Sequence, residues 1–292
     1  MNRLMTGGEP FFFQAGTVGC LMVHGLTSAP DEMRPLGRYL AQQGITALGI
    51  RLSGHATHPS HLTRMNAGDW LDCLADGFQM LRRHCNTIIL AGLSLGGALS
   101  LTYAASAPIQ GVIALSTPYD LPPQPQLRFV KIILPMLRLT QVVLRYLPKP
   151  PPLDYRDPEA ARNHLGYAWI PTRAALETGV VLAEMRRSLP AVHAPVLMIH
   201  SHGDRGVPPS NARWVFERLG SREKSLLWLQ NSGHVITLEP ERKRAFKAAA
   251  DFIHNLAARR RAHTHLRVEP GEPADADGPH SNPEQIVDLA KY

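Results

Sequence analysis

Residues 87–99 read TIILAGLSLGGAL, and this stretch decides the fold. Its first five residues are apolar or β-branched, which is typical of a strand that is covered on both faces. From Leu95 the apolar residues take helical spacing as far as residue 107. Ser94 therefore falls on a sharp strand-to-helix turn, inside the motif G-x-S-x-G, where Gly92 and Gly96 leave room between crowded backbones. Because this turn exposes a serine beside a helix N-terminus, Ser94 is a candidate nucleophile.

The same alternation of short apolar runs and longer helical patterns extends over most of the chain. Strands are expected at residues 18–24, 45–50, 87–91, 111–115, 195–200 and 225–229, and helices at 31–43, 67–84, 95–107, 210–219 and 241–256. This alternation predicts an α/β fold with a mostly parallel sheet flanked by helices. Between residues 115 and 195 about 80 residues contain no clear strand, which predicts an inserted helical cap.

Four parts are therefore expected along the chain. Residues 1–116 form the first part of the core and carry the nucleophile turn, and residues 117–190 form the cap or lid. Residues 191–258 complete the core, and residues 259–292 form a tail that is first basic and then acidic. The tail is expected to be disordered, because Pro, Gly, Asp and Glu dominate it from residue 267 onward.

Composition and charge exclude several classes of protein. The 292 residues are 44% hydrophobic and 19% charged, which is ordinary for a globular chain that buries a core without metals or disulfides. The net charge is +7, but no basic and aromatic motif of a nucleic-acid binder accompanies it, so no nucleic-acid partner is expected. Three cysteines without a C-x-x-C pair, no signal peptide and no membrane-spanning run predict a cytoplasmic protein.

A serine nucleophile needs a general base and an acid that orients the base. His234 follows the strand expected at 225–229, and Asp204 follows the strand expected at 195–200. Both therefore fall at the carboxyl ends of strands, where open parallel sheets bind ligands. Asp204 is the predicted acid and His234 the predicted base, in the chain order serine, acid, histidine.

Other residues compete for these roles less well. Asp120 also follows an expected strand and is an alternative acid, whereas His200 and His202 precede Asp204 and so lie on the wrong side of it for the base. The chain has two sets of closely spaced histidines. One set is His55, His58 and His61, and the other is His263 and His265. They lack carboxylate or cysteine partners at ligand spacing, so no metal site is predicted.

Backbone N–H groups for a developing oxyanion are expected at two places. His24-Gly25-Leu26 follows the first strand, and Gly25 allows a turn that points the N–H of Leu26 toward the substrate oxygen. The N–H of Leu95, directly after the nucleophile, is the second predicted donor. His24 itself is interpreted as structural.

These segments together resemble the bacterial carboxylesterase/monoacylglycerol lipase family of the α/β-hydrolase superfamily. The matching segments are HGLT at 24–27, RLSGH at 51–55, GLSLGG at 92–97, the turn at 204–208 and SGHVI at 232–236. The resemblance covers about residues 17–257 and implies an α/β-hydrolase fold. It also implies hydrolysis of short- to medium-chain esters without a cofactor, with Ser94, Asp204 and His234 as triad and Leu26 and Leu95 as oxyanion donors.

This chain departs from the family pattern at Ala56, where glycine is common, and at Leu26, where an aromatic residue is frequent. Its cap is also longer and richer in proline. These departures bear on which small-molecule ester or lipid is the substrate. They do not bear on the reaction that the triad performs. Amide hydrolysis, C–C bond hydrolysis and acyl transfer to an alcohol stay open as alternatives, as does a non-catalytic binding protein on this fold.

The cap carries one further pattern, between residues 127 and 147. Lys131, Arg138 and Arg145 are spaced by seven and form a polar stripe with Gln141, while apolar residues cover the rest of a helical segment that Pro135 kinks. One interpretation is an ordinary lid over the acyl pocket. The other is that one apolar side lines the acyl pocket, while the opposite side, flanked by the basic stripe, meets a lipid or micelle surface.

Overall fold

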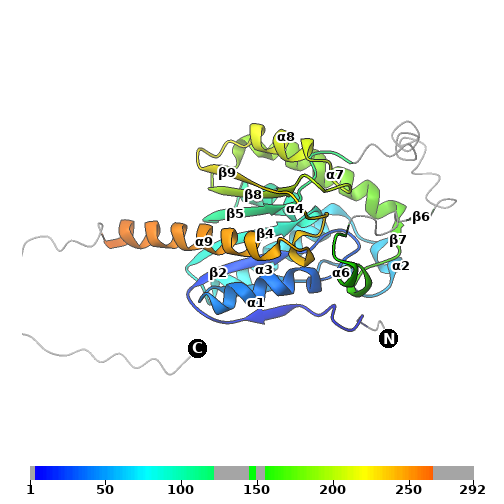
Figure 1. The fold of residues 1–292 in the computed structure, drawn as a ribbon, viewed down its shortest axis with the longest axis horizontal. Helices are drawn as coiled ribbons and strands as arrows, with labels where there is room; N and C mark the ends of the chain where they lie inside the picture. The colour runs from blue at the N-terminus through cyan, green and yellow to red at the C-terminus, as the bar shows by residue number, and fades with distance from the viewer. Residues whose placement is uncertain (1–3, 122–144, 149–154, 266–292) are drawn as a thin grey trace, which may run out of the picture.

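The computed structural model describes residues 4–121, 145–148 and 155–265 (Figure 1). Its main sheet has seven strands in the order β1-β3-β2-β4-β5-β8-β9. Strand β1 pairs antiparallel with β3, and every other neighbouring pair in this sheet is parallel. The predicted α/β-hydrolase fold, a mostly parallel sheet flanked by helices, is confirmed.

All six predicted strands are present, with ends that shift by a residue or two. They are β2 (Val18–Val23), β3 (Thr46–Ile50), β4 (Thr87–Leu93), β5 (Gly111–Leu115), β8 (Val196–Ser201) and β9 (Lys224–Leu229). The edge strand β1 (Phe11–Phe13) was not predicted, because three residues are too few for a periodic signal. Central strands such as β2 and β4 are buried along their whole length, as strands between two helical layers should be.

Two apolar cores lie on opposite faces of the sheet. Helices α1 (Arg34–Gln42) and α9 (Arg242–His265) cover one face, and α3 (Ala67–Arg82), α4 (Leu95–Ala104) and α8 (Ser210–Arg218) cover the other. Alternate residues of one strand serve the two cores: Leu21 faces α3 and α4, whereas Met22 faces α1. Short helices α2 (Pro59–Leu62), η1 (Pro30–Met33), η2 (Leu189–Ala191) and η3 (Ile236–Leu238) fill the connections.

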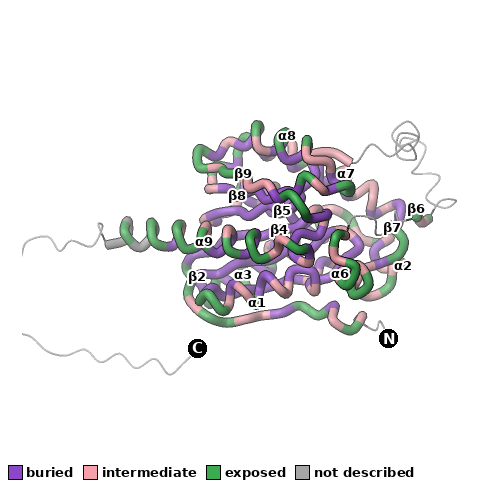
Figure 2. The backbone as a smooth tube through the Cα atoms, in the orientation of Figure 1, coloured by how far each residue is buried: buried purple, intermediate pink, exposed green. Residues whose placement is uncertain are grey.

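Helix α9 is longer than its apolar pattern predicted. The pattern ends at Leu256, but the helix continues to His265 and so includes the start of the region expected to be a tail. Residues 257–262 are alanines and arginines, which favour helix, and Ala258, Arg259 and Arg260 are exposed. Figure 2 shows this end of α9 exposed. The rest of the expected tail lies outside the described residues.

The segment between β5 and β8 holds the expected helices and also two strands that the sequence did not predict. In chain order these are β6 (Tyr146–Pro148), α6 (Pro158–Asn163), β7 (Trp169–Pro171) and α7 (Thr172–Ser188), and β6 pairs antiparallel with β7. The expectation of a strand-free insertion is therefore wrong for these six residues. Helix α7 packs on α4 through Ala174, Val181 and Leu182.

Most of the amphipathic stripe predicted at 127–147 lies outside the described residues. Its described end, Tyr146–Pro148, is strand rather than helix, so a helical stripe as far as Leu147 is wrong there. No helix in the described part of the chain is long and apolar enough to cross a bilayer.

The contact between α3 and the sheet depends on one glycine, which leads to a test. An ideal Cβ at Gly77 would lie 2.7 Å from Ile50 Cγ2 and 2.9 Å from Leu21 Cδ1. We expect Gly77→Val to lower the free energy of unfolding by about 1–3 kcal/mol, because it overpacks this face. Gln79→Val puts the same side chain on the exposed face of α3 and should change stability little. Equal urea midpoints for the two variants would contradict this packing.

Candidate active site

Ser94 lies on the turn between β4 and α4, and the turn holds it in an unusual backbone conformation. Its φ is 56° and its ψ is −117°, a region that residues with a Cβ rarely adopt. The Ser94 N–H donates a 2.8 Å hydrogen bond to the carbonyl of Leu115, at the end of β5. The turn therefore places Ser94 at the carboxyl edge of the sheet, beside the first turn of α4.

Two glycines make this turn possible. An ideal Cβ at Gly92 would lie 2.1 Å from the Gly96 oxygen, and one at Gly96 would lie 2.2 Å from the Val23 oxygen. Both contacts are with backbone atoms, which cannot move aside cheaply. The motif G-x-S-x-G is thus required by close backbone packing, as the sequence analysis argued.

The predicted acid and base lie in direct contact. His234 Nδ1–H donates a 2.9 Å hydrogen bond to Asp204 Oδ2. The other Asp204 oxygen accepts a 2.6 Å hydrogen bond from the N–H of Val207. Because Nδ1 carries the proton in this arrangement, Nε2 of His234 is left as the ring's acceptor.

Asp204 is buried, with 3% of its surface exposed, yet its surroundings favour the ionised form. Burial alone raises the pKa of this carboxyl, but the charge and hydrogen bond of His234 and the nearby His200 outweigh it and hold the pKa below its ordinary value. His200 Nε2 lies 3.4 Å from Asp204 Oδ2 and 2.9 Å from the Val207 oxygen. Asp204 is therefore arranged as a carboxylate that faces an imidazole.

A residue that the sequence analysis missed, Ser116, holds the His234 backbone. Ser116 follows β5 directly, has a φ of 44°, and donates a 2.7 Å hydrogen bond from Oγ to the His234 oxygen. Its neighbour Leu115 accepts the hydrogen bond from the Ser94 N–H. Two consecutive residues at the end of β5 thus fix the backbones of Ser94 and His234. In the sequence Ser116 is one small polar residue directly after an apolar strand, a signal too common to single it out.

The backbones of Ser94 and His234 are held at one sheet edge, Ser94 by the Leu115 carbonyl and His234 by the Ser116 hydroxyl. The structure thus joins Asp204 to His234 directly, and it brings Ser94 to them through Leu115 and Ser116.

The loop after β2 lies against the nucleophile. An ideal Cβ on Gly25 would lie 3.5 Å from Ser94 Cβ, so Leu26 follows a residue that touches the nucleophile turn. His24 is fully buried; its Nδ1–H donates to the Gly25 oxygen at 2.9 Å and its Nε2 accepts from the Leu52 N–H at 3.1 Å. Backbone groups engage both ring nitrogens, so His24 has a structural role.

The second predicted oxyanion donor, Leu95, begins α4. The first N–H groups of a helix have no intrahelical partner, so the Leu95 N–H has none within α4.

The competing residues lie in other environments. Asp120 is half exposed, and its Oδ1 lies 3.8 Å from Arg186 Nη1. His202 stacks on Trp228, with ring centroids 4.4 Å apart. Among the described residues, no group of three or more His, Cys, Asp or Glu side chains is arranged to hold a metal ion.

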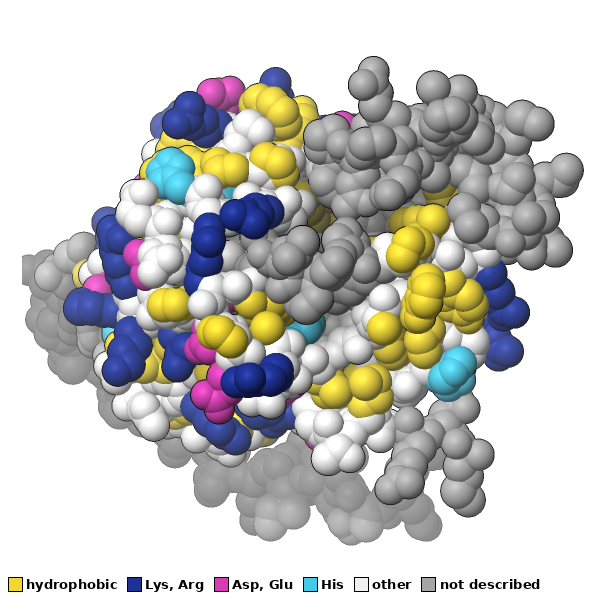
Figure 3. All heavy atoms as spheres, turned by 45° about the vertical axis from the view of Figure 1, so that its right-hand side comes forward, with side chains coloured by type: hydrophobic (Ala, Val, Ile, Leu, Met, Phe, Trp, Pro, Cys, Tyr) yellow, Lys and Arg dark blue, Asp and Glu magenta, His cyan; other side chains and the backbone are white. Residues whose placement is uncertain are grey.

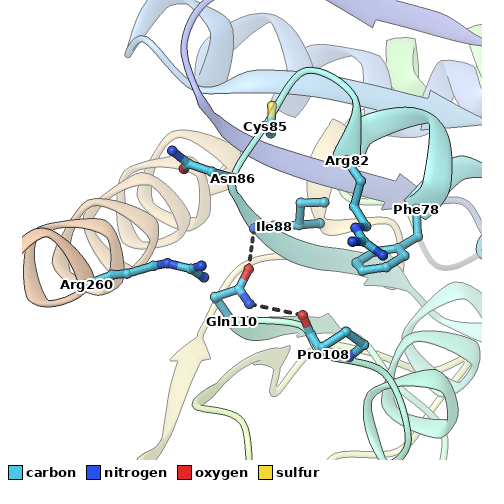
Figure 4. A pocket seen from close by; sticks show the side chains of 8 residues that line it. All are labelled: Phe78, Arg82, Cys85, Asn86, Ile88, Pro108, Gln110 and Arg260. Carbon is cyan, nitrogen blue, oxygen red and sulfur yellow. Dashed lines mark hydrogen bonds between the residues drawn. The ribbon is translucent and has the colours of Figure 1, made fainter. Parts of the chain in front are cut away.

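A hollow of about 340 Å³ lies at the other edge of the sheet (Figure 4). Gln110 lines it; its side chain accepts a 2.6 Å hydrogen bond from the Ile88 N–H and donates one of 3.0 Å to the Pro108 oxygen. Ile88 and Gln110 stand at the amino ends of β4 and β5, whereas Ser94 follows the carboxyl end of β4. This hollow therefore does not belong to the candidate site.

Comparison with known proteins agrees with this geometry. The family described as serine aminopeptidase, S33 (Hydrolase_4) matches residues 18–241. A thermostable monoacylglycerol lipase of Bacillus sp. (strain H-257) is 32% identical over 86% of this chain and 96% of its own. A carboxylesterase of Bacillus subtilis (strain 168) is 26% identical over 85% of this chain and 97% of its own. A solved structure of metagenome-derived lipolytic enzymes (LipS and LipT) superposes with a TM-score of 0.79 at 29% identity, covering 87% of this chain and all of that one.

The hydrogen bond between Asp204 and His234 can be tested against the rival acid. Asp204→Asn replaces the carboxylate that selects the Nδ1–H tautomer, so we expect kcat for p-nitrophenyl butyrate to fall about 10³- to 10⁴-fold. Asp120→Asn makes the same chemical change at a half-exposed site and should leave kcat unchanged. The reverse pattern in steady-state kinetics would assign the acid to Asp120.

Proposed function

This chain belongs to the Hydrolase_4 family of α/β-hydrolases, and from that premise we propose that Ser94, Asp204 and His234 are its catalytic triad. The chain is a hydrolase of the carboxylesterase and monoacylglycerol lipase kind. Its substrates on this proposal are short- to medium-chain carboxylic esters, monoacylglycerols among them. One observation carries the proposal: a buried carboxylate faces His234 Nδ1 at 2.9 Å, at the sheet edge where the strained turn presents Ser94.

Acylation follows from the positions of these groups. His234 Nε2 takes the proton of the Ser94 hydroxyl as Oγ attacks the ester carbonyl carbon. Asp204 stabilises the imidazolium that forms, because it is already ionised and hydrogen-bonded to Nδ1–H. The carbonyl oxygen becomes an oxyanion, which accepts hydrogen bonds from the N–H groups of Leu26 and Leu95.

Collapse of the tetrahedral intermediate expels the alcohol, which receives the proton from His234. The acyl group is then bonded to Ser94 Oγ. A water molecule gives its proton to His234 and attacks the acyl carbonyl, and breakdown of the second intermediate returns the proton to Ser94 and releases the acid. The residues named here complete this cycle without a cofactor.

Amide hydrolysis, C–C bond hydrolysis and acyl transfer use the same triad, so the triad does not separate them from ester hydrolysis. Ester hydrolysis is favoured by the two relatives named above, a monoacylglycerol lipase and a carboxylesterase. A panel of p-nitrophenyl esters of rising acyl length, a monoacylglycerol and a peptide amide separates ester hydrolysis from amide hydrolysis. A non-catalytic binding protein would turn over none of them.

We also propose that the cap meets lipid surfaces, which would suit a lipid substrate. The described part of the cap exposes Trp169 of β7 by 52% and Val180 of α7 by 54%. In Figure 3, turned to bring the β6–β7 side forward, hydrophobic side chains gather on this side of the molecule.

We also propose a cytoplasmic location from the cysteine content. Cys20, Cys73 and Cys85 are free thiols, as is usual in a reducing compartment.

Removing the nucleophile tests the triad. We expect Ser94→Ala to abolish turnover of p-nitrophenyl butyrate while the far-UV circular dichroism and melting temperature stay close to those of the parent protein. Ser106→Ala, an exposed serine after α4, is the matched control and should keep full activity. If Ser94→Ala retained more than a few per cent of the parent kcat, another nucleophile would be required.

Charge reversal on the cap tests the lipid contact. We expect the protein to bind anionic phosphatidylglycerol vesicles in a cosedimentation assay, and salt should weaken the binding. The variant Lys131→Glu/Arg138→Glu/Arg145→Glu should lose that binding and keep its activity on a short ester.

The matched control reverses three exposed charges elsewhere, in the variant Arg83→Glu/Arg213→Glu/Lys243→Glu. It carries the same net charge as the cap variant, so it separates a local contact from a general electrostatic attraction. Vesicle binding that is equal in the parent and the cap variant, or lost equally in both variants, would exclude a specific role for the cap.

A further inference from the structure

A carboxylate that the triad does not use lies behind the nucleophile. Glu32 follows the loop after β2, and 2% of its surface is exposed. Its Oε1 accepts a short hydrogen bond from the N–H of Gly25, and its Oε2 accepts one of 2.5 Å from Ser28 Oγ. Gly25 precedes Leu26, the proposed oxyanion donor. The carboxylate therefore holds the loop that presents the Leu26 N–H.

The cap supplies the remaining partner of this carboxylate. His164, just after α6, places Nε2 3.3 Å from Glu32 Oε2 and 3.0 Å from Ser28 Oγ. Since the Ser28 hydroxyl gives its proton to Glu32, Nε2 of His164 must carry a proton to serve both oxygens. Three residues further on, the Tyr167 N–H donates a 2.8 Å hydrogen bond to the Thr27 oxygen. This part of the cap is thus fastened to the oxyanion loop at two points.

The surroundings of Glu32 keep it ionised at any physiological pH. Burial alone raises the pKa of the carboxyl, but the hydrogen bonds and charge of His164 and the hydrogen bond from Ser28 outweigh it and lower the pKa to about 2. A buried carboxylate without partners is strongly unfavourable, so Gly25, Ser28 and His164 are held to it firmly. Charge-assisted hydrogen bonds of this kind are roughly twice as strong as neutral ones.

We propose that Glu32, completed by His164 of the cap, is a positioning residue that fixes the oxyanion loop for catalysis. It touches no reacting atom; it acts through Gly25 on the direction of the Leu26 N–H. The loop must hold this direction closely, because Gly25 already lies against Ser94 and because Thr27, on the other side of Leu26, has a φ of 61°. This inference rests on the proposed triad and oxyanion donors.

Glu32→Gln is the variant that tests it. The amide keeps the volume and one oxygen for the Gly25 N–H, but it loses the charge and cannot accept from both Ser28 and His164. On p-nitrophenyl butyrate we expect kcat to fall about 10- to 100-fold while KM changes little. A misdirected N–H stabilises the oxyanion of the transition state less, but it hardly changes the binding of the ground-state ester. His164→Gln should give a smaller fall of the same kind.

A second readout reports on the oxyanion itself. An alkyl trifluoromethyl ketone reacts reversibly with a serine hydrolase: Ser94 Oγ adds to its carbonyl carbon, the serine proton passes to His234, and the carbonyl oxygen becomes an oxyanion. Its inhibition constant should rise in Glu32→Gln by about the factor that kcat loses. A merely structural role would lower the melting temperature without changing either quantity.

Glu177→Gln is the matched control, since Glu177 also joins the cap to the core. It lies on α7, accepts a 3.1 Å hydrogen bond from the Ala67 N–H at the start of α3, and pairs with Arg173 at 3.3 Å. Its loss should leave kcat and the inhibition constant unchanged. If Glu32→Gln and His164→Gln behave like Glu177→Gln, Glu32 does not position the loop.

The same experiment distinguishes this failure from a failure of the proposed function. An active parent protein that loses activity in Ser94→Ala, with unaffected Glu32→Gln, overturns only the role of Glu32. A parent protein that hydrolyses no ester and does not bind the ketone overturns the proposed function. If Glu32→Gln does not fold, His164→Gln decides, because the His164 side chain keeps 11% exposure and its loss leaves Glu32 bonded to Gly25 and Ser28.

Discussion

The turn at Ser94 is the constraint on which the rest of the site depends. A residue with a Cβ is held at a φ of 56°, and such strain persists only where the surroundings determine the backbone completely. Here the surroundings are the Leu115 carbonyl, which accepts the Ser94 N–H, and the backbones that pack against Gly92 and Gly96. The parallel sheet supplies the Leu115 and Val23 carbonyls, because β2, β4 and β5 are neighbours that end at one edge, and the first turn of α4 supplies the Gly96 oxygen.

Each of three buried carboxylates in the described part of the chain bonds to a loop of the candidate site. Asp204 bonds His234, Glu32 bonds Gly25, and Glu239 accepts a 2.9 Å hydrogen bond from the N–H of Gly233. Glu239 also accepts the N–H of Arg156, just before α6, and Glu32 meets His164 just after it. The short helix α6 is thus fastened on one side to the loop of the base and on the other to the oxyanion loop. Buried charges are costly, so a fold keeps them where they hold geometry that apolar packing cannot.

Features of the fold and of the candidate site that are encoded in short stretches of the chain could be predicted from the sequence. The strands around Ser94 show as apolar runs, and the order of Ser94, Asp204 and His234 follows from strand ends, which the hydrogen bond at 2.9 Å supports. Contacts between distant residues have no such local pattern. Ser116 bonds His234 across 118 residues and Glu32 meets His164 across 132, and neither pair is distinguishable in one sequence from ordinary polar residues. The end of α9 was missed because propensity, rather than burial, extends it.

The identity of the nucleophilic serine is the most direct test of this account. A fluorophosphonate probe phosphonylates an activated serine with loss of fluoride and stays attached, so peptide mass spectrometry identifies the residue. The triad proposed here predicts one modified peptide, carrying the adduct on Ser94, and labelling that disappears in Asp204→Asn or when His234 is replaced by Ala. Stoichiometric labelling at another serine, or an unlabelled Ser94 in a protein that hydrolyses esters, would contradict it.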